Sequence, residues 1–271
     1  MYFYYQKEDI LEYIMTKDKN TLIDLSTTLA NYGFEGRPPE ITYWTHNECT
    51  RYYSKLLGVT PLDFPDNESL TVEKVHAITH TGTHMDAPWH FGKFTEGKKS
   101  KTIDEIPLEW CYGDGVLLDL RHKKKDENIT ERDLEKALND INYVLKPGDI
   151  VLLMVLGGDK YLEDVNYSSS HPGLTGEAVL WVLDQGVKMI GTDAYSLDKP
   201  FKTMAKECNE GNKKALWPAH FIGRIKEYCH IEKLANLDQL PYPYNFKVAA
   251  FPIKIANASA GWVRVVAIIN C

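Results

Sequence analysis

The 271-residue sequence lacks several features that would place it in a familiar class of protein. Its five cysteines are odd in number and include no Cys-x-x-Cys pair, which argues against a disulfide framework or a zinc ribbon and favours a reducing compartment. Its longest apolar run, residues 150–156, is far shorter than the roughly 20 residues that cross a bilayer. The chain does not open with a basic segment and an apolar stretch, so we expect no secretory signal and a cytoplasmic protein.

The chain also lacks a net positive charge. The formal net charge is −7, which gives no support for the basic face that a nucleic-acid-binding protein needs. No Gly-x-Gly-x-x-Gly, P-loop or internal repeat is present. We therefore expect a small-molecule substrate, with neither nucleic acid nor membrane as a partner.

Hydrophobic periodicity predicts one domain that contains both strands and helices, because apolar alternation and helical spacing both occur along the chain. We expect an α/β domain over residues 21–271, with a mixed central sheet and flanking helices, preceded by an N-terminal extension, 1–20, with a short helix. Strands are predicted over 21–25, 70–79, 115–120, 150–156, 187–191, 246–253 and 262–269, and helices over 6–16, 45–57, 130–139 and 175–185.

Four of the nine histidines lie between residues 76 and 90. His80 and His84 are four apart, but two threonines and Gly82 between them disfavour a helix, and Pro88 prevents one from continuing. We expect a loop or tight turn after a strand, where His84 and Asp86 share one side and Gly82 lets the chain bend so that His80 joins them. Three such ligands suit zinc or manganese, and the carboxylate could bridge two ions.

His90 completes this pattern of three histidines and an aspartate. Burying these polar side chains without a ligand or a partner would cost folding free energy. His76 lies just outside the pattern, and we expect that residue to have a structural role in the preceding strand. Residues His80 to His90 resemble the signature His-x-Gly-Thr-His-x-Asp-x-Pro-x-His of the metal-dependent cyclase/hydrolase family that includes bacterial kynurenine formamidase and isatin hydrolase. Further similarity lies in Asp24-Leu-Ser, in Gly191 to Asp198, and in His220 followed twelve residues later by Glu232.

The resemblance implies a role for each matching position. His80, His84, Asp86, His220 and Glu232 would bind one or two divalent ions, with zinc favoured and manganese as the alternative. His90 would transfer a proton. The resemblance also implies a swivelling β/β/α type of domain and homodimers or larger assemblies. Of the remaining candidates, we expect His171 to line the pocket mouth and Glu177 to occupy the first turn of a helix.

The activity implied is metal-dependent hydrolysis of a C–N bond in an amide, formamide or lactam. A second hypothesis keeps the same metal as a Lewis acid for cyclisation, lactone hydrolysis or dehydration. A third is a non-catalytic metal-binding protein, against which the intact His90 argues. Compared with the formamidases, the chain has extra length around 31–66 and 157–173, and we expect these loops to shape the pocket.

Overall fold

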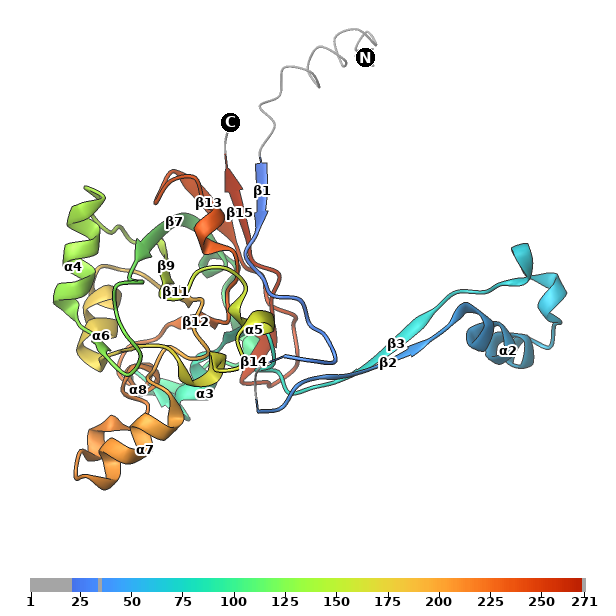
Figure 1. Ribbon diagram of the computed structural model, residues 1–271, viewed down its shortest axis with the longest axis horizontal. Coiled ribbons are helices and arrows are strands. Elements are labelled where there is room, and N and C mark those ends of the chain that lie inside the picture. The colour runs from blue at the N-terminus through green and yellow to red at the C-terminus, as the bar shows by residue number, and fades with distance from the viewer. Residues whose placement is uncertain (1–20, 34–35, 270–271) are drawn as a thin grey trace, which may run out of the picture.

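The computed structural model describes residues 21–33 and 36–269, and its body is built on a curled mixed sheet with helices packed against it (Figure 1). The predicted extension and helix within residues 1–20 lie outside the described residues. Nine strands form the sheet in the order β1-β15-β13-β7-β9-β11-β12-β4-β14. Their bounds are β1 Thr21–Asp24, β4 His84–Asp86, β7 Tyr112–Asp119, β9 Ile150–Met154, β11 Met189–Thr192, β12 Cys229–Glu232, β13 Phe246–Ala249, β14 Ala260–Trp262 and β15 Val266–Ile269.

The centre of the sheet is parallel and both sides are antiparallel. Strands β7, β9, β11 and β12 run parallel to one another, whereas the strands outside them pair antiparallel. The Ile-Val-Leu-Leu-Met sequence of β9 is buried throughout, as expected for a strand covered on both faces. β7 passes close to β13, where a Cβ on Gly115 would come within 2.1 Å of the Phe246 ring.

Two apolar clusters fill the two faces of the sheet. On one face, Leu134 of α4 (Glu131–Asp140) and Val179 of α6 (Gly176–Asp184) pack on Val151 and neighbouring strand residues. The other cluster joins Met85 near one end of the sheet to Ile269 near the other, so the sheet curls around it. Helix α6 begins at the N-cap Thr175, whose hydroxyl accepts the Ala178 N–H, and it is followed by Gly186 at φ +90°.

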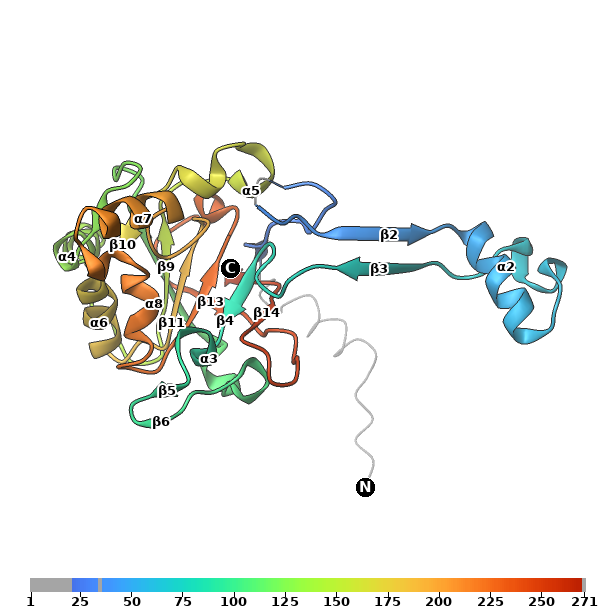
Figure 2. The same ribbon diagram turned by 90° about the horizontal axis from the view of Figure 1, so that it is seen from below.

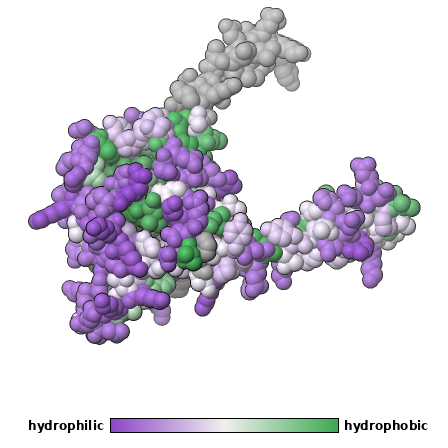
Figure 3. All heavy atoms as spheres, viewed as in Figure 1, coloured by the Kyte–Doolittle hydropathy of each residue, from purple (hydrophilic) through white to green (hydrophobic). Residues whose placement is uncertain are grey.

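A long arm leaves the body between β1 and β4 (Figures 1 and 2). Its stem is an antiparallel pair, β2 (Glu40–Trp44) and β3 (Val72–His76), and its tip carries α2 (His46–Leu57). A capping box between Thr45 and Glu48 starts this helix, and Gly58 ends it in the left-handed conformation. In the space-filling view the arm stands clear of the body (Figure 3).

Short elements complete the chain around the sheet. Helix α8 (Pro218–Ile222) packs against α6, and α7 (Phe201–Asn209) projects beyond it. The remaining helices are α3 Pro88–Phe91 and α5 Lys160–Glu163. Two short strand pairs are β5 Phe94–Thr95 with β6 Lys98–Lys99, and β8 Asn128–Ile129 with β10 Gly173–Leu174. The 3₁₀ turns are η1 Pro61–Asp63, η2 Pro65–Asn67, η3 Ile103–Glu105, η4 Leu108–Trp110, η5 Tyr167–Ser169, η6 Lys213–Ala215 and η7 Leu237–Gln239.

The predicted α/β class with a mixed central sheet and flanking helices is confirmed. The other predicted elements within the described residues exist, with ends shifted by a few residues, but the single strand predicted over 262–269 is split into the end of β14 and the whole of β15, which lie at opposite sides of the sheet. Two further expectations were wrong in detail. The predicted strand at 70–79 belongs to the arm and not to the sheet. The segment expected to be a loop contains strand β4, and Pro88 occupies the first turn of the one-turn helix α3.

Candidate metal centre

The centre of the site lies across two neighbouring strands, β4 and β12. In their antiparallel register Asp86 is opposite His230 and His84 is opposite Glu232. Residues two apart on a strand point to the same face, so these four side chains meet on one side. Met85 and Ile231, which alternate with them, join the apolar cluster on the other side. All four polar side chains are buried.

His220 reaches the same place from helix α8. Asp198, fully buried in the segment after β11, holds the start of this helix by accepting the backbone N–H groups of Ala219 at 2.7 Å and His220 at 3.3 Å. The same carboxylate lies 2.5 Å from His220 Nδ1, so that nitrogen donates to Asp198 and Nε2 is turned toward the strands. His220 Nε2 is 3.8 Å from Asp86 Oδ2 and 3.7 Å from Glu232 Oε1.

Asp86 is the residue that all the histidines of the cluster approach. Its Oδ1 lies 2.8 Å from His80 Nδ1 and 3.4 Å from His84 Nε2. Its Oδ2 lies 2.9 Å from His230 Nε2. Two overlapping groups of potential ligand atoms, each within 4.8 Å of one another, both include it: Asp86, His220, His230 and Glu232 in one, and His80, His84 and Asp86 in the other.

The donor set fits a divalent metal. His84 Nδ1 lies 2.8 Å from the Gly82 carbonyl and donates to it, which leaves Nε2 as an acceptor. That Nε2 is buried and has no hydrogen-bond partner among the described residues. An orphaned imidazole nitrogen beside two buried carboxylates is an arrangement that a cation would satisfy, because buried charges need a partner or a metal. Gly82 adopts a φ of +61°, which provides the bend predicted at this position.

The charged side chains of the cluster shift one another's pKa values. Burial would raise the pKa of Asp86, but His90, His80 and His84 together hold it well below its usual range. Burial likewise opposes ionisation of Glu232, and its hydrogen bond with His230 contributes most to lowering the pKa of that carboxyl. Burial alone would lower the pKa of His230, yet its hydrogen bonds with Asp86 and Glu232 raise it to about 10. The two anionic carboxylates thus draw positive charge into the site.

His90 stands at the edge of the cluster on α3, with a third of its side chain exposed. Its Nε2 is 3.8 Å from Asp86 Oδ2, and its ring centroid is 4.3 Å from that of His80. Burial lowers the pKa of His90 to about 4; Asp86 opposes this shift, and the neighbouring histidines add to it. The imidazole is therefore neutral at pH 7 and able to accept a proton.

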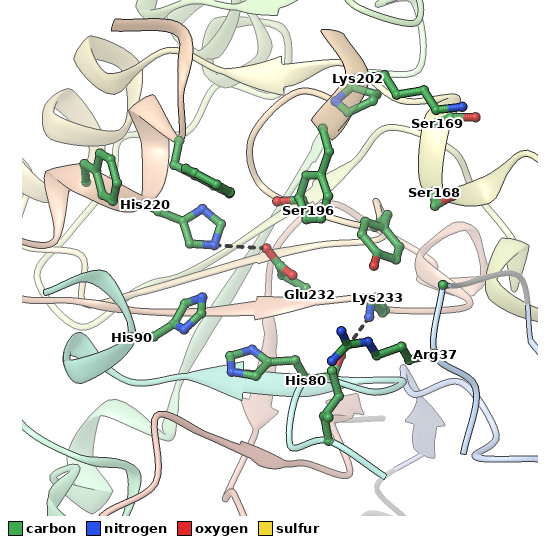
Figure 4. Close-up of a pocket in the computed structure, with 17 residues that line it drawn as sticks. Arg37, His80, His90, Ser168, Ser169, Ser196, Lys202, His220, Glu232 and Lys233 are labelled. Carbon is green, nitrogen blue, oxygen red and sulfur yellow. Dashed lines mark hydrogen bonds and ion pairs between the residues drawn. The ribbon is translucent and has the colours of Figure 1, made fainter. Parts of the chain in front are cut away.

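A pocket of 770 Å³ opens onto this cluster. His80, His90, His220 and Glu232 lie along one side of it, and Arg37, Ser168, Ser169 and Lys202 lie toward the other (Figure 4). The two longer loops, around 31–66 and 157–173, therefore both reach the pocket, as expected. Arg37 belongs to the first loop, and Ser168 and Ser169 belong to the second. Tyr195, Phe201, Trp217 and Phe221 supply aromatic walls.

The structure brings together all six residues predicted for the site, His80, His84, Asp86, His90, His220 and Glu232. Their roles stay predictions. Sequence reasoning missed His230, whose signal was the alternation His-x-Glu on β12, and it gave Asp198 no role. The expectation for His171 was wrong, because that side chain is fully buried and does not line the pocket. His76 lies in β3 opposite Glu40, apart from the cluster.

A family model described as "Putative cyclase" matches residues 23–199, well over half of the chain. The chain belongs to this cyclase family. The predicted resemblance is thereby confirmed, and the matched segment contains the histidine motif and Asp198, whereas His220 and Glu232 lie beyond it.

Curated relatives in this family include kynurenine formamidases. An enzyme of Bacillus cereus is 26% identical over 77% of this chain and 88% of its own length. That of Erythrobacter litoralis is 26% identical over 74% of this chain and 78% of its own. Among solved structures, isatin hydrolase A from Labrenzia aggregata has a TM-score of 0.71 at 20% identity, covering 97% of this chain and 99% of that one. The isatin hydrolase structure shares the fold of this chain.

Proposed function

We propose that this protein is a metal-dependent hydrolase that cleaves the C–N bond of an amide, formamide or lactam. The observation that carries the proposal is the buried cluster of histidines and two carboxylates beside a 770 Å³ pocket, with His90 at its edge. The kynurenine formamidase relatives and the isatin hydrolase fold support the same chemistry. A pocket of this volume suits a small molecule.

The residues that would hold the metal are His80, His84, Asp86, His220 and Glu232. Nitrogen and oxygen donors favour zinc, and manganese is the alternative. Because Asp86 belongs to both groups of candidate ligands, these donors could serve one ion or two. When bound, the ion would polarise a carbonyl oxygen and make water more acidic.

His90 moves the proton in this proposal. With its pKa lowered to about 4, the ring is neutral at pH 7 and first accepts a proton from the attacking water. The protonated ring then donates to the nitrogen that leaves as the C–N bond breaks. Its ring lines the pocket, 5.4 Å from the His220 ring, on the side where a bound substrate would meet the cluster. Buried His230 instead fixes both carboxylates through hydrogen bonds.

The activity is tested by screening chelator-treated protein, reloaded with zinc or manganese, against N-formylanilines, isatin-like lactams and lactones. We expect free amine and acid from the first two groups. Release of product from lactones alone would favour the Lewis-acid alternative. No turnover on the whole panel by fully loaded protein would favour a metal-binding protein without catalysis.

The role of His90 is tested by His90→Ala, with His122→Ala as a control because His122 is exposed and lies outside both the pocket and the arm. We expect His90→Ala to keep its metal and to lose about 10²–10⁴ in turnover. Loss of metal from this variant would show that His90 is a ligand.

We further propose that two copies pair through the arm. Every residue of β3 is exposed, and at the tip Tyr52, Leu56 and Leu57 are each more than 60% exposed. A two-stranded hairpin is marginal in water on its own, and large apolar side chains exposed at its tip are candidates for a contact with a second copy. Sedimentation should show a dimer for the wild type and a monomer for Leu56→Asp, whereas Val144→Asp on the body should stay dimeric.

Cytoplasmic location is also a proposal. Cys49, Cys111, Cys208 and Cys229 are all free thiols, which suits a reducing compartment. Within the described ranges every helix is too short or too polar to cross a bilayer. Fractionation of the source cells, with the protein followed by antibody, tests this proposal.

A further inference from the structure

His230 is a buried histidine that the family resemblance leaves without a role. It lies on β12, two residues before Glu232, so both side chains point to the face of the sheet that carries the cluster. The residue is fully buried, and its Nε2 lies 2.9 Å from Asp86 Oδ2 and 3.3 Å from Glu232 Oε1. This nitrogen therefore faces one oxygen of each buried carboxylate.

His220 approaches the same two oxygen atoms from helix α8. Its Nε2 lies 3.8 Å from Asp86 Oδ2 and 3.7 Å from Glu232 Oε1 (Figure 4). The rings of His220 and His230 stand edge to face, with their centroids 4.5 Å apart. One ligand atom of each of these four residues lies within 4.8 Å of those of the other three. Two imidazole nitrogens and two carboxylate oxygens thus converge on one position.

The spacing of these atoms fits a tetrahedral ion. Zinc binds imidazole nitrogen and carboxylate oxygen at about 2.0–2.2 Å, so neighbouring ligand atoms of a tetrahedral site lie roughly 3.3–3.6 Å apart. The distances from the two histidine nitrogens to the two oxygens run from 2.9 to 3.8 Å. Without His230, three protein atoms would leave one corner of the tetrahedron to another group.

The second ring nitrogen of each histidine is held by a partner. Asp198 accepts from His220 Nδ1. The Tyr228 hydroxyl donates to the Ala219 carbonyl at 3.0 Å and lies 3.3 Å from His230 Nδ1, so its oxygen accepts from that nitrogen. A histidine that binds a metal typically donates its other ring N–H in this way, which fixes the tautomer and turns the ligand nitrogen toward the ion.

We propose that His230 is a metal ligand, and that it holds one ion together with Asp86, His220 and Glu232 through two nitrogens and two oxygens. This proposal rests on the proposed metal-dependent hydrolase and adds a ligand to its site. Without an ion, the Nε2–H of His230 donates to both carboxylates. When an ion binds, that proton leaves to solvent and the nitrogen lone pair binds the ion in its place.

The first test uses cobalt(II), which occupies zinc sites and is paramagnetic. In the proton spectrum of a cobalt protein, the ring N–H of each ligand histidine gives a strongly shifted, exchangeable resonance. We expect His230→Gln to lack one of the resonances that the wild type shows. The glutamine amide can still donate to a carboxylate, but it removes the ligand nitrogen. In chelator competition, cobalt affinity should fall by at least about 10- to 100-fold, the loss caused by removing even an outer partner of a ligand.

His171→Gln is the matched control. His171 is as fully buried as His230, but among the described residues it belongs to neither group of candidate ligands. The number of shifted resonances and the cobalt affinity should therefore match the wild type.

A measurement on the wild type needs no variant and so does not depend on how a variant folds. Anomalous diffraction from zinc-loaded crystals should place an ion about 2.0–2.2 Å from His230 Nε2. An ion held by the other three residues, with His230 still donating to the carboxylates, would overturn the proposal.

Neither measurement requires turnover, so the outcomes separate this proposal from the hydrolase proposal. Unchanged resonances and affinity in His230→Gln would remove His230 from the ligand set and leave metal-dependent hydrolysis intact. A wild-type protein that binds neither cobalt nor zinc would overturn both.

Discussion

Asp198→Asn should weaken metal binding although Asp198 is not itself a candidate ligand. One oxygen of the carboxylate accepts the Ala219 N–H at 2.7 Å, and the other lies 2.5 Å from His220 Nδ1 and 3.3 Å from the His220 backbone nitrogen. An amide has one oxygen, so its NH₂ group must face one of these donors. Leaving a buried donor unsatisfied costs about 1–3 kcal/mol of folding free energy.

The same change loosens the orientation of His220 Nε2. Loss of a partner that orients a ligand histidine weakens metal affinity by about 10- to 100-fold, which corresponds to about 1.4–2.7 kcal/mol. The assay is chelator competition for zinc, combined with urea unfolding of the metal-free protein. Asp133→Asn is the control, because that carboxylate accepts two hydrogen bonds from Thr130 at the start of α4. The control should lose stability and keep its zinc affinity. A normal zinc affinity in Asp198→Asn would refute the reasoning.

Three further predictions concern the cluster and the core. His84→Ala should purify without bound metal by elemental analysis, and metal at the wild-type level would remove His84 from the ligand set. In metal-free protein the pKa of His230 is raised to about 10, so the protonated ring stabilises the folded state. This contribution to the free energy of unfolding is complete below pH 6.5 and is lost as the pH rises through 10. Urea unfolding should show that decline, and His230→Gln should flatten it; an unchanged slope would contradict the assignment. Gly115→Ala should lower the free energy of unfolding by about 1–3 kcal/mol, because its Cβ would meet Phe246 at 2.1 Å, whereas Gly36→Ala, with open space around it, should not.

The local sequence was sufficient to predict how one part of the site is assembled. His80, His84 and Asp86 lie within seven residues, so their spacing, the glycine bend and the alternation of a strand determine how they meet. His220 and Glu232 depended on a resemblance, because no short-range rule connects a helix to a strand twelve residues later.

The positions of His230 and Asp198, which the sequence did not assign to the site, depend on contacts between distant segments of the chain. His230 acquires its place from the register of β12 against β4, which brings it opposite Asp86, 144 positions away in the sequence. Asp198 acquires its role only when α8 folds against the segment that follows β11. The alternation in residues 70–79 correctly indicated a strand, observed over 72–76, but alternation cannot tell a strand that joins the sheet from one that pairs only with β2 in an arm.

The most direct test of the central claim is a metal titration of chelator-treated protein against a formanilide substrate. The account predicts negligible amine release without metal, activity that rises with added zinc or manganese, and a plateau at one or two equivalents per chain. Full activity in the metal-free protein, confirmed by elemental analysis, would contradict it.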